Sequence, residues 1–517
     1  MDNEPKVDRS YTRDHRFWSV IIALSTMVFL GFLENTVKVT VSRTAFLNYA
    51  AVQPLFRQLS NLFGRRFLAL LIVAIYILGS GISGGANYPA MLITGRAIQG
   101  AGSGGMTMIV SVIISDLVPL RDRGYFQAII AMTFGIGMAI GPVIGGLIVQ
   151  NISWRWVFYI NLPVGGLSLV LLWLFLHVKW DRETKVRDKL KAIDIIGNTV
   201  LVASTVSILI ALTWAGAIHS WSSYQIIVPL VMGVLGLIGF CGLEGSTLVP
   251  NPVMPLRLFA NRTSMIVYAN TFLVSMLNYW IFFFLPIYFQ SVKLSTPSRS
   301  GVQILPITFI LIPGAAIGAI VLSSWGKYKL LHIGGFALLT AGMGYLSVLD
   351  KGSNTAEWVC LQIILPSLGA GIVVDTLLPA FQTGVAESDS AAATASWTFI
   401  RSFGNIWGVA IPSAIFNSYT NQYAYDIIDS SAQEYLLHGD AYSSATKAFV
   451  EGFPMQAQSQ IIEVFTKALS KVFMIATAFS GLAFVLSFIE GEVELRTELT
   501  TDFGLEEKEP TGTSNKV

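Results

Sequence analysis

Long apolar runs alternate with short polar segments along almost the whole chain. A bilayer core about 30 Å thick needs roughly 20 apolar residues per helix, and most of the runs approach or exceed that length. The pattern predicts membrane-spanning helices at 17–41, 44–56 (short), 67–86, 90–114, 125–149, 156–177, 193–215, 226–243, 265–290, 302–323, 330–349, 358–385, 396–418 and 472–489. These roughly fourteen segments fall into groups of six, two and six. We therefore expect an all-α polytopic membrane protein, in which two six-helix bundles flank two extra helices and the second span is truncated.

The polar segments between the runs divide the chain into regions. Segment 421–471 is too polar to cross a membrane, so we expect a large external loop there, within the second bundle. The end of the chain is acidic and polar, a composition typical of disorder. The expected regions are a cytosolic N-terminal tail (1–16), the N-terminal bundle (17–178), a basic cytosolic linker (179–192), the extra helix pair with its linker (193–262), the C-terminal bundle (263–490) and the acidic tail (491–517).

Lysine and arginine gather in alternate connections between the runs. Arg65 and Arg66 lie in one such connection, Arg121 and Arg123 in the next but one, and the linker 179–192 is strongly basic. The connections in between carry few or none. Because cytoplasmic loops are enriched in these residues, the alternation places both termini in the cytosol.

Composition agrees with a lipid environment and argues against several classes of function. The chain is 53% hydrophobic and 12% charged, whereas soluble domains carry about a quarter charged residues. A formal net charge of +2 is too small to indicate nucleic-acid binding. The five histidines are scattered, and the sequence holds no metal pair or nucleophile–base set, so we expect neither an enzyme nor a cofactor.

Four segments carry a resemblance to a known family. They are QLSNLFGRR (58–66), GRAIQG (95–100), GIGMAIGPVIGG (135–146) and SWRWVFYINLP (153–163). The chain resembles the major facilitator superfamily, and the grouping of its spans is similar to the fourteen-span drug:proton antiporter branch. The resemblance implies proton-coupled efflux of a small organic molecule, such as a secondary metabolite, toxin or drug. It also implies a monomer in the lipid bilayer of the plasma membrane, with the vacuolar membrane as the alternative, and with protons and the organic solute as partners.

The third of these segments is similar to the motif associated with exporters. Its small residues remove side chains from one helix face, and its proline allows a bend. Two interpretations are open: a pivot for alternating access, or static close packing. The residues concerned are Gly135, Gly141, Pro142, Gly145 and Gly146.

Charged residues inside spans are candidates for proton coupling. Arg96 lies within the fourth run, where a guanidinium needs a partner or a water-filled cavity. Glu34 resembles the acidic position of helix one in the antiporter branch and could carry a proton. Lys38 lies one helical turn further on and could instead neutralise Glu34. A structural pair between Arg96 and helix one is the alternative to coupling.

Asp375 is a third candidate for proton coupling, because it lies in the middle of an apolar run. It could carry a proton, bind a cationic substrate or pair with Arg401 of the next span. For the substrate cavity we expect polar and aromatic residues inside spans, with ordinary core packing as the alternative for each one. These residues are Gln99, Asn278, Tyr279, Trp280 and Gln362.

The connection between the second and third runs is predicted to be a cytosolic gating loop. Its candidate residues are Asn61, Gly64, Arg65 and Arg66, and asparagine stands at 61 where the family usually has aspartate. Residues 17–56 are barely enough for two crossings of roughly 20 residues each, so about 25 residues of the family pattern are missing here. A transport-impaired or sensor-like member of the family, or an uptake carrier, is therefore the alternative to an exporter.

Overall fold

The computed structural model is built of helices. It describes residues 15–33, 53–119, 122–123, 125–130, 132–133, 136–137, 148, 152–177, 194–215, 219–246, 252, 254–354, 357, 363–385, 389–437 and 441–493. Over these ranges the β structure consists of one isolated bridge, between Ala215 and His219. Nine helical segments in the same ranges are long and apolar enough to cross a membrane. The structure therefore confirms the predicted all-α polytopic class.

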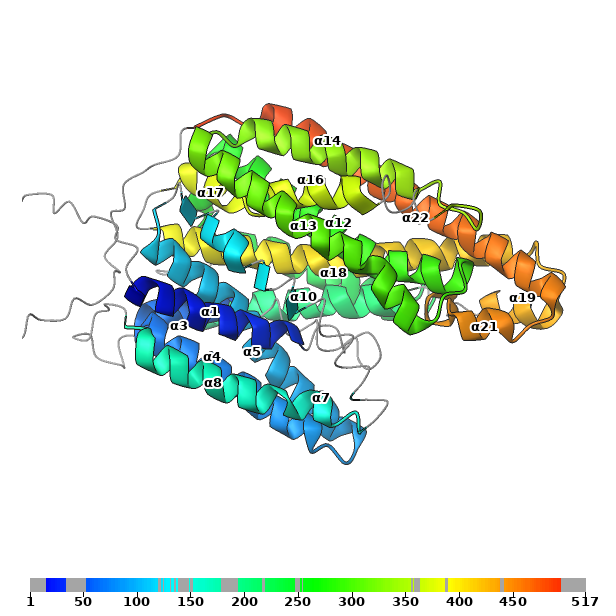
Figure 1. Cartoon of the computed structure of the whole chain (residues 1–517), viewed down its shortest axis with the longest axis horizontal. Helices are drawn as coiled ribbons and strands as arrows, with labels where there is room; N and C mark the ends of the chain where they lie inside the picture. Colours follow the sequence, from blue (N-terminus) through cyan, green and yellow to red (C-terminus); the bar gives the residue numbers. More distant parts are fainter. Residues whose placement is uncertain are drawn as a thin grey trace, which may run out of the picture.

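The N-terminal bundle forms one side of the molecule (Figure 1). Its helices pack mainly through α4 against α5 and through α8 against both α4 and α1. The second of them, α3, has only 11 residues and packs against α4 and α5. The elements are α1 (His15–Leu33), α3 (Gln53–Phe63), α4 (Arg65–Gly84), α5 (Pro89–Leu117), α7 (Trp156–Tyr159) and α8 (Asn161–Phe175).

The remaining helices form the extra pair and the C-terminal bundle. The extra pair is α10 (Ile195–Trp214) and α11 (Tyr224–Glu244), followed by the short turn η2 (Leu256–Phe259). The bundle comprises α12 (Arg262–Ile287) with its π-helical extension η3 (Tyr288–Val292), α13 (Pro297–Trp325), α14 (Lys329–Leu346), α16 (Leu365–Val374), α17 (Leu377–Thr383), α18 (Ser390–Ala424), α19 (Ser430–Leu437), α20 (Ala441–Ser444), α21 (Lys447–Glu451) and α22 (Met455–Ile489).

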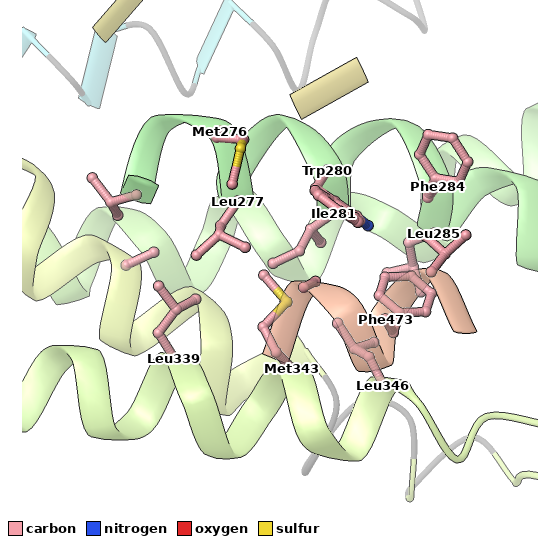
Figure 2. Packing of buried hydrophobic residues seen from close by; sticks show 14 of the residues in the cluster. Met276, Leu277, Trp280, Ile281, Phe284, Leu285, Leu339, Met343, Leu346 and Phe473 are labelled. Atoms are coloured by element: carbon pink, nitrogen blue, oxygen red, sulfur yellow. The ribbon is translucent and has the colours of Figure 1, made fainter. Parts of the chain in front are cut away.

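Each bundle has its own packed core. The larger core belongs to the C-terminal bundle, and Figure 2 shows where α12, α14 and α22 meet in it around Trp280, Met343 and Phe473. The second core belongs to the N-terminal bundle, and its one member from the other half is Ala395 of α18. Two separate cores allow the bundles to move as two bodies, with α18 at the seam between them.

The extra pair lies against α18 (Figure 1). Small apolar clusters join them: Leu201 and Phe240 pack with Phe399, and Leu209 packs with Ile406. The connection back to the C-terminal bundle is held by Arg257, whose guanidinium donates to both carboxylate oxygens of Asp389 at 2.7 Å. This hydrogen bond raises the pKa of Arg257 above its usual value.

Glycines let α12 and α18 approach closely. A Cβ on Gly404 would lie 2.6 Å from the carbonyl oxygen of Phe272, and one on Gly408 would lie 2.2 Å from that of Met276. The two glycines are spaced as in a GxxxG motif. Helices in lipid associate through such small-residue faces, because burial of apolar side chains gives no advantage there. The α12–α18 pair is therefore fixed by backbone contact.

A buried polar cluster ties the end of α22 to α14 and α12. His332 Nδ1 lies 2.6 Å from Glu490 Oε2, and both side chains are fully buried. Asn270 of α12 donates to the other carboxylate oxygen at 2.9 Å. Tyr328 adds a hydrogen bond from its hydroxyl to the carbonyl of Gly491 at 2.6 Å. Helices α14 and α22 are thus joined to α12 by hydrogen bonds.

The structure differs from the expected external loop in its boundaries. Helix α18 continues to Ala424 and α22 already begins at Met455, so the connection is shorter than 421–471 and contains α19–α21. Both long helices have 35 residues, about 52 Å, which exceeds a bilayer core of about 30 Å. Their outer ends and the short helices project together at one end of the molecule (Figure 1). This projection explains why the segment is too polar for lipid.

Candidate transport site and gate

Arg123 joins the two bundles at the end where α12 and α18 begin, the predicted cytosolic end. Its side chain is 1% exposed. It donates to Gln382 Oε1 at 2.8 Å and to Ser390 Oγ at 2.9 Å, both in the C-terminal bundle. It also donates to the carbonyls of Val118 and Ser115 in its own bundle, at 2.8 and 2.6 Å. Within the described ranges, this one arginine therefore bridges both halves with four hydrogen bonds.

Further hydrogen bonds extend this contact into a layer. Ser115 Oγ of α5 lies 3.0 Å from Thr394 Oγ1 of α18, and Gln382 Nε2 donates to the same Thr394 oxygen at 2.7 Å. Ser323 of α13 donates to Asp122 at 3.1 Å, beside a pocket of about 270 Å³ between the bundles. Among the described residues, all hydrogen bonds between the two bundles lie at this end. We call this set of contacts the inter-bundle layer.

The predicted gating loop lies beside the inter-bundle layer. Gly64 has φ 86°, a left-handed conformation that suits glycine, and it ends α3 so that α4 can begin at Arg65. Arg65 Nε donates to Asp116 Oδ2 at 2.9 Å, and both side chains are almost fully buried. Arg66 donates to the carbonyl of Trp173 in α8. The side chain of Asn61 lies outside the described residues.

Arg96 is held inside the N-terminal bundle. It is 1% exposed, and its guanidinium lies over the ring of Phe158 in α7, 4.3 Å from the ring centre. It donates to Gln99 Oε1 at 3.3 Å, and Gln99 in turn donates to Ser80 of α4 at 2.7 Å. The structure thus joins two predicted site residues, Arg96 and Gln99, at a junction of α4, α5 and α7.

Several predicted site residues lie outside the described part of the chain. Glu34 is one, so its distance from Arg96 stays a prediction. The exporter motif and one cavity residue are others, so the pivot and that part of the cavity also stay predictions. The residues are Gly135, Gly141, Pro142, Gly145, Gly146 and Gln362.

Asp375 lies at a break in the helix that sequence reading expected to be continuous over 358–385. It ends α16, and α17 begins at Leu377. The side chain is 3% exposed, and its Oδ2 has no hydrogen-bond partner among the described residues. The positive charge of Arg401 on α18 acts on it electrostatically. A buried acid at a broken helix is a position typical of ion or substrate binding in transporters.

The three aromatic and amide candidates of α12 separate in the structure. Trp280 is fully buried and packs with Met343 and Phe473 inside the C-terminal bundle (Figure 2), which fits the packing alternative. Asn278 and Tyr279 are half-buried, and Tyr279 stacks on Phe283 with ring centres 5.8 Å apart. Only the latter two remain candidates for a cavity.

Sequence reading missed most of the inter-bundle layer and the buried partner of Arg65. It treated Arg123 only as a cytosolic charge and gave Asp116, Gln382 and Thr394 no role. A signal was present, because Asp116 and Gln382 are polar residues near the ends of apolar runs. Their meaning depends on which helices meet there, and one sequence does not contain that information.

Comparison with known proteins identifies the family. Residues 16–409 match the Major Facilitator Superfamily. The chain is 48% identical over 514 residues to the MFS-type transporter TwmF of Talaromyces wortmannii. The match covers 96% of this chain and 93% of TwmF. The chain belongs to the Major Facilitator Superfamily. It is therefore a multi-pass membrane transporter and not an enzyme, as the sequence predicted.

Other relatives in the superfamily are nearly as similar. The MFS efflux transporter aclA of Aspergillus oryzae is 41% identical, over 98% of this chain and 95% of its own. The efflux pump FUS6 of Gibberella fujikuroi is 40% identical, over 99% of this chain and 95% of its own.

Two solved structures share the fold. The human organic anion transporter MFSD10 matches with a TM-score of 0.52 at 14% identity, covering 89% of this chain and 98% of its own. An auto-inhibited POT family peptide transporter matches with a TM-score of 0.57 at 13% identity, covering 94% and 99%. At these identities the likeness concerns the fold alone.

Proposed function

We propose that this chain is a proton-coupled antiporter that exports small organic molecules, such as a secondary metabolite, toxin or drug. The observation that carries the proposal is the inter-bundle layer. Two bundles with separate cores are tied by hydrogen bonds at one end, which is the arrangement a rocking carrier needs in one of its end states. Breaking the layer would open a central site to the cytosol.

The direction of transport is inferred from the relatives. Two proteins 40 to 41% identical over nearly their full length are named as efflux transporters. The glycine–proline segment 135–146, which is similar to the exporter motif, also favours export over uptake. We place the carrier in the plasma membrane as a monomer, with the vacuolar membrane as the alternative.

The coupling residues are proposed from charge and burial. Glu34, which we propose acts together with Arg96, is the first acid, and Asp375 is the second. One elementary charge moved through 100 mV supplies about 2.3 kcal/mol, and each pH unit supplies about 1.4 kcal/mol. One proton can thus drive a substantial solute gradient without a nucleotide.

The test is transport by the purified full chain in proteoliposomes loaded with rhodamine 6G and a pH-sensitive dye. With the cytosolic face inside, an acidic bath should drive rhodamine out while protons enter faster than in liposomes without protein. Proton entry that is independent of rhodamine, or no rhodamine movement, contradicts the antiporter. Inward accumulation instead supports an uptake carrier, and a folded protein that moves neither solute supports the sensor-like alternative.

Matched variants locate the coupling. Arg96→Gln and Glu34→Gln should abolish rhodamine export driven by pH while keeping downhill rhodamine exchange. Arg155→Gln serves as the control, because the guanidinium of Arg155 donates to Gly84 and Asn87 at the far end of the same bundle. Full pH-driven export in Arg96→Gln would overturn the coupling role.

A further inference from the structure

Arg401 is an arginine deep in α18 whose side chain forms no hydrogen bond or ion pair with the part of the chain that the structure describes. It lies 11 residues beyond the start of the helix at Ser390, which is about 16 Å at 1.5 Å per residue. This depth is close to the middle of a bilayer core of about 30 Å. An arginine there is costly unless it faces a partner or a cavity.

The surroundings of Arg401 leave its donors available. Its guanidinium lies over the ring of Trp397, 5.2 Å from the ring centre, and the side chain is half-buried. Within the described ranges it forms no hydrogen bond and no direct ion pair, and Asp375 acts on it only through its charge. A ring over one face of the planar group leaves the N–H groups at its edge for another acceptor.

The position of Arg401 on α18 places it at the seam between the bundles. Thr394 is seven residues earlier, two helical turns away on the same face, and it contacts Ser115 of the N-terminal bundle. The same spacing links Asp375 to Gln382, which donates to Thr394. Asp375 and Arg401 therefore form the next level above the inter-bundle layer, on the side away from the predicted cytosol.

We propose that Arg401 binds the acidic group of transported molecules that carry one, so that organic acids are among the exported substrates. The proposal rests on the proposed function, because it names the substrate class of that carrier. A guanidinium offers two parallel N–H donors that match a carboxylate, and such charge-assisted bonds are about twice as strong as neutral ones. The Oδ2 of Asp375 has no hydrogen-bond partner among the described residues, and the charge of Arg401 acts on this carboxyl group.

Asp375 sets the charge of this site. While it is ionised it competes with the substrate anion for the same guanidinium, and when it is protonated the anion gains full access. Asp375 then keeps its proton while the substrate is bound. When the substrate is an organic acid, the exchanged proton therefore travels through Glu34, the first of the two acids proposed for coupling.

The experiment compares 2-naphthoate with its neutral counterpart 2-naphthamide, using calorimetric binding to the full chain in nanodiscs. The wild type should bind the acid at least tenfold more tightly, which corresponds to about 1.4 kcal/mol. Arg401→Gln should bind 2-naphthamide as tightly as the wild type does and should lose the preference for the acid. Arg401→Lys should keep part of that preference. Asp375→Asn should bind the acid more tightly than the wild type. Arg299→Gln, an exposed arginine at the start of α13, should behave as the wild type.

Three outcomes overturn the inference: no preference for the acid in the wild type, an unchanged preference in Arg401→Gln, or no binding of either probe. The proteoliposome assay separates this failure from failure of the proposed function. Rhodamine export driven by pH without any acid preference contradicts the organic-acid site alone. Acid-selective binding without such export contradicts the antiporter alone.

Discussion

Arg123 illustrates how much of the gate depends on one side chain. Within the described residues, the buried guanidinium of Arg123 donates four hydrogen bonds, two to each bundle. Hydrogen bonds to a charged group are worth about 1.5–3 kcal/mol each. Loss of the charge therefore weakens the closed cytosolic end more than any single neutral substitution in the layer.

We predict that Arg123→Gln opens the cytosolic end. The reporter is Ala395→Cys in a Cys241→Ser, Cys360→Ser background, because Ala395 is 1% exposed within the N-terminal core cluster. Maleimide labelling of this cysteine should rise at least tenfold, since a loss of about 1.4 kcal/mol changes a population tenfold.

The control for this experiment is Arg155→Gln, which removes an arginine from the opposite end of the N-terminal bundle. Its labelling rate should equal that of the reporter alone. Equal labelling in Arg123→Gln and the reporter would show that Arg123 does not hold the bundles together.

Asp116 is predicted to be needed mainly because Arg65 is buried beside it. Removing one partner of a buried ion pair costs about 3–5 kcal/mol, whereas replacing both by apolar residues is often neutral. Asp116→Leu should therefore lower the unfolding free energy in detergent by that amount, and Arg65→Met with Asp116→Leu should recover most of it. A double variant as unstable as the single one would contradict a direct pair.

At the residue scale, a charge that stands alone in an apolar run is the clearest signal in the sequence, and the transport roles of such residues stay predictions. Arg96 and Asp375 were found in this way, and the structure places both in buried positions. Sequence reading did not separate Trp280 from Asn278, because an aromatic residue in a span has the same pattern whether it faces a core or a cavity. Burial on α12 depends on neighbouring helices that are far away in sequence.

At the scale of helix pairs, glycine allows the close approach of α12 and α18. Gly408 lies where α18 touches the backbone of α12, and a Cβ there would also lie 2.8 Å from Tyr279 Cβ. Gly408→Ala must push the two helices apart, so we predict a lower melting temperature and weaker transport.

Gly334→Ala in α14 provides the matched control, because a Cβ at Gly334 meets no atom within 4 Å. There the substitution should stabilise by roughly 0.5–1 kcal/mol, through reduced chain entropy. The two glycines therefore have predicted effects of opposite sign on the melting temperature. The same sign for both would show that the α12–α18 contact is not tight.

At the element scale, apolar length predicted most helices because the thickness of the bilayer sets it. The exceptions have physical causes. Residues 53–63 form the 11-residue α3, since the chain is too short there for a full span. Helix α22 begins at Met455, well before Val472, because its first turns also pack on α18, where Phe465 stacks on Phe416. The break at Asp375 has no signal in hydropathy.

For the whole molecule, the two cores and their contacts suggest how the carrier moves. The His332–Glu490 cluster and the α12–α18 glycine contact hold the helices of the C-terminal bundle together, so we expect it to move as one body. The six-two-six grouping predicted both bundles, because each forms from neighbouring stretches of the chain. The contact surface between bundles could not be predicted, since it joins residues such as Asp122 and Ser323 that are 201 positions apart.

Rocking of the bundles about the seam can be tested by distance measurements between spin labels in nanodiscs. One pair, Phe67→Cys and Leu330→Cys, reports on the predicted cytosolic end, and the other, Tyr88→Cys and Met455→Cys, reports on the opposite end; all four side chains are exposed. Introducing Arg123→Gln should lengthen the first distance and shorten the second. If both distances stay unchanged, or change in the same direction, the bundles do not rock about the seam.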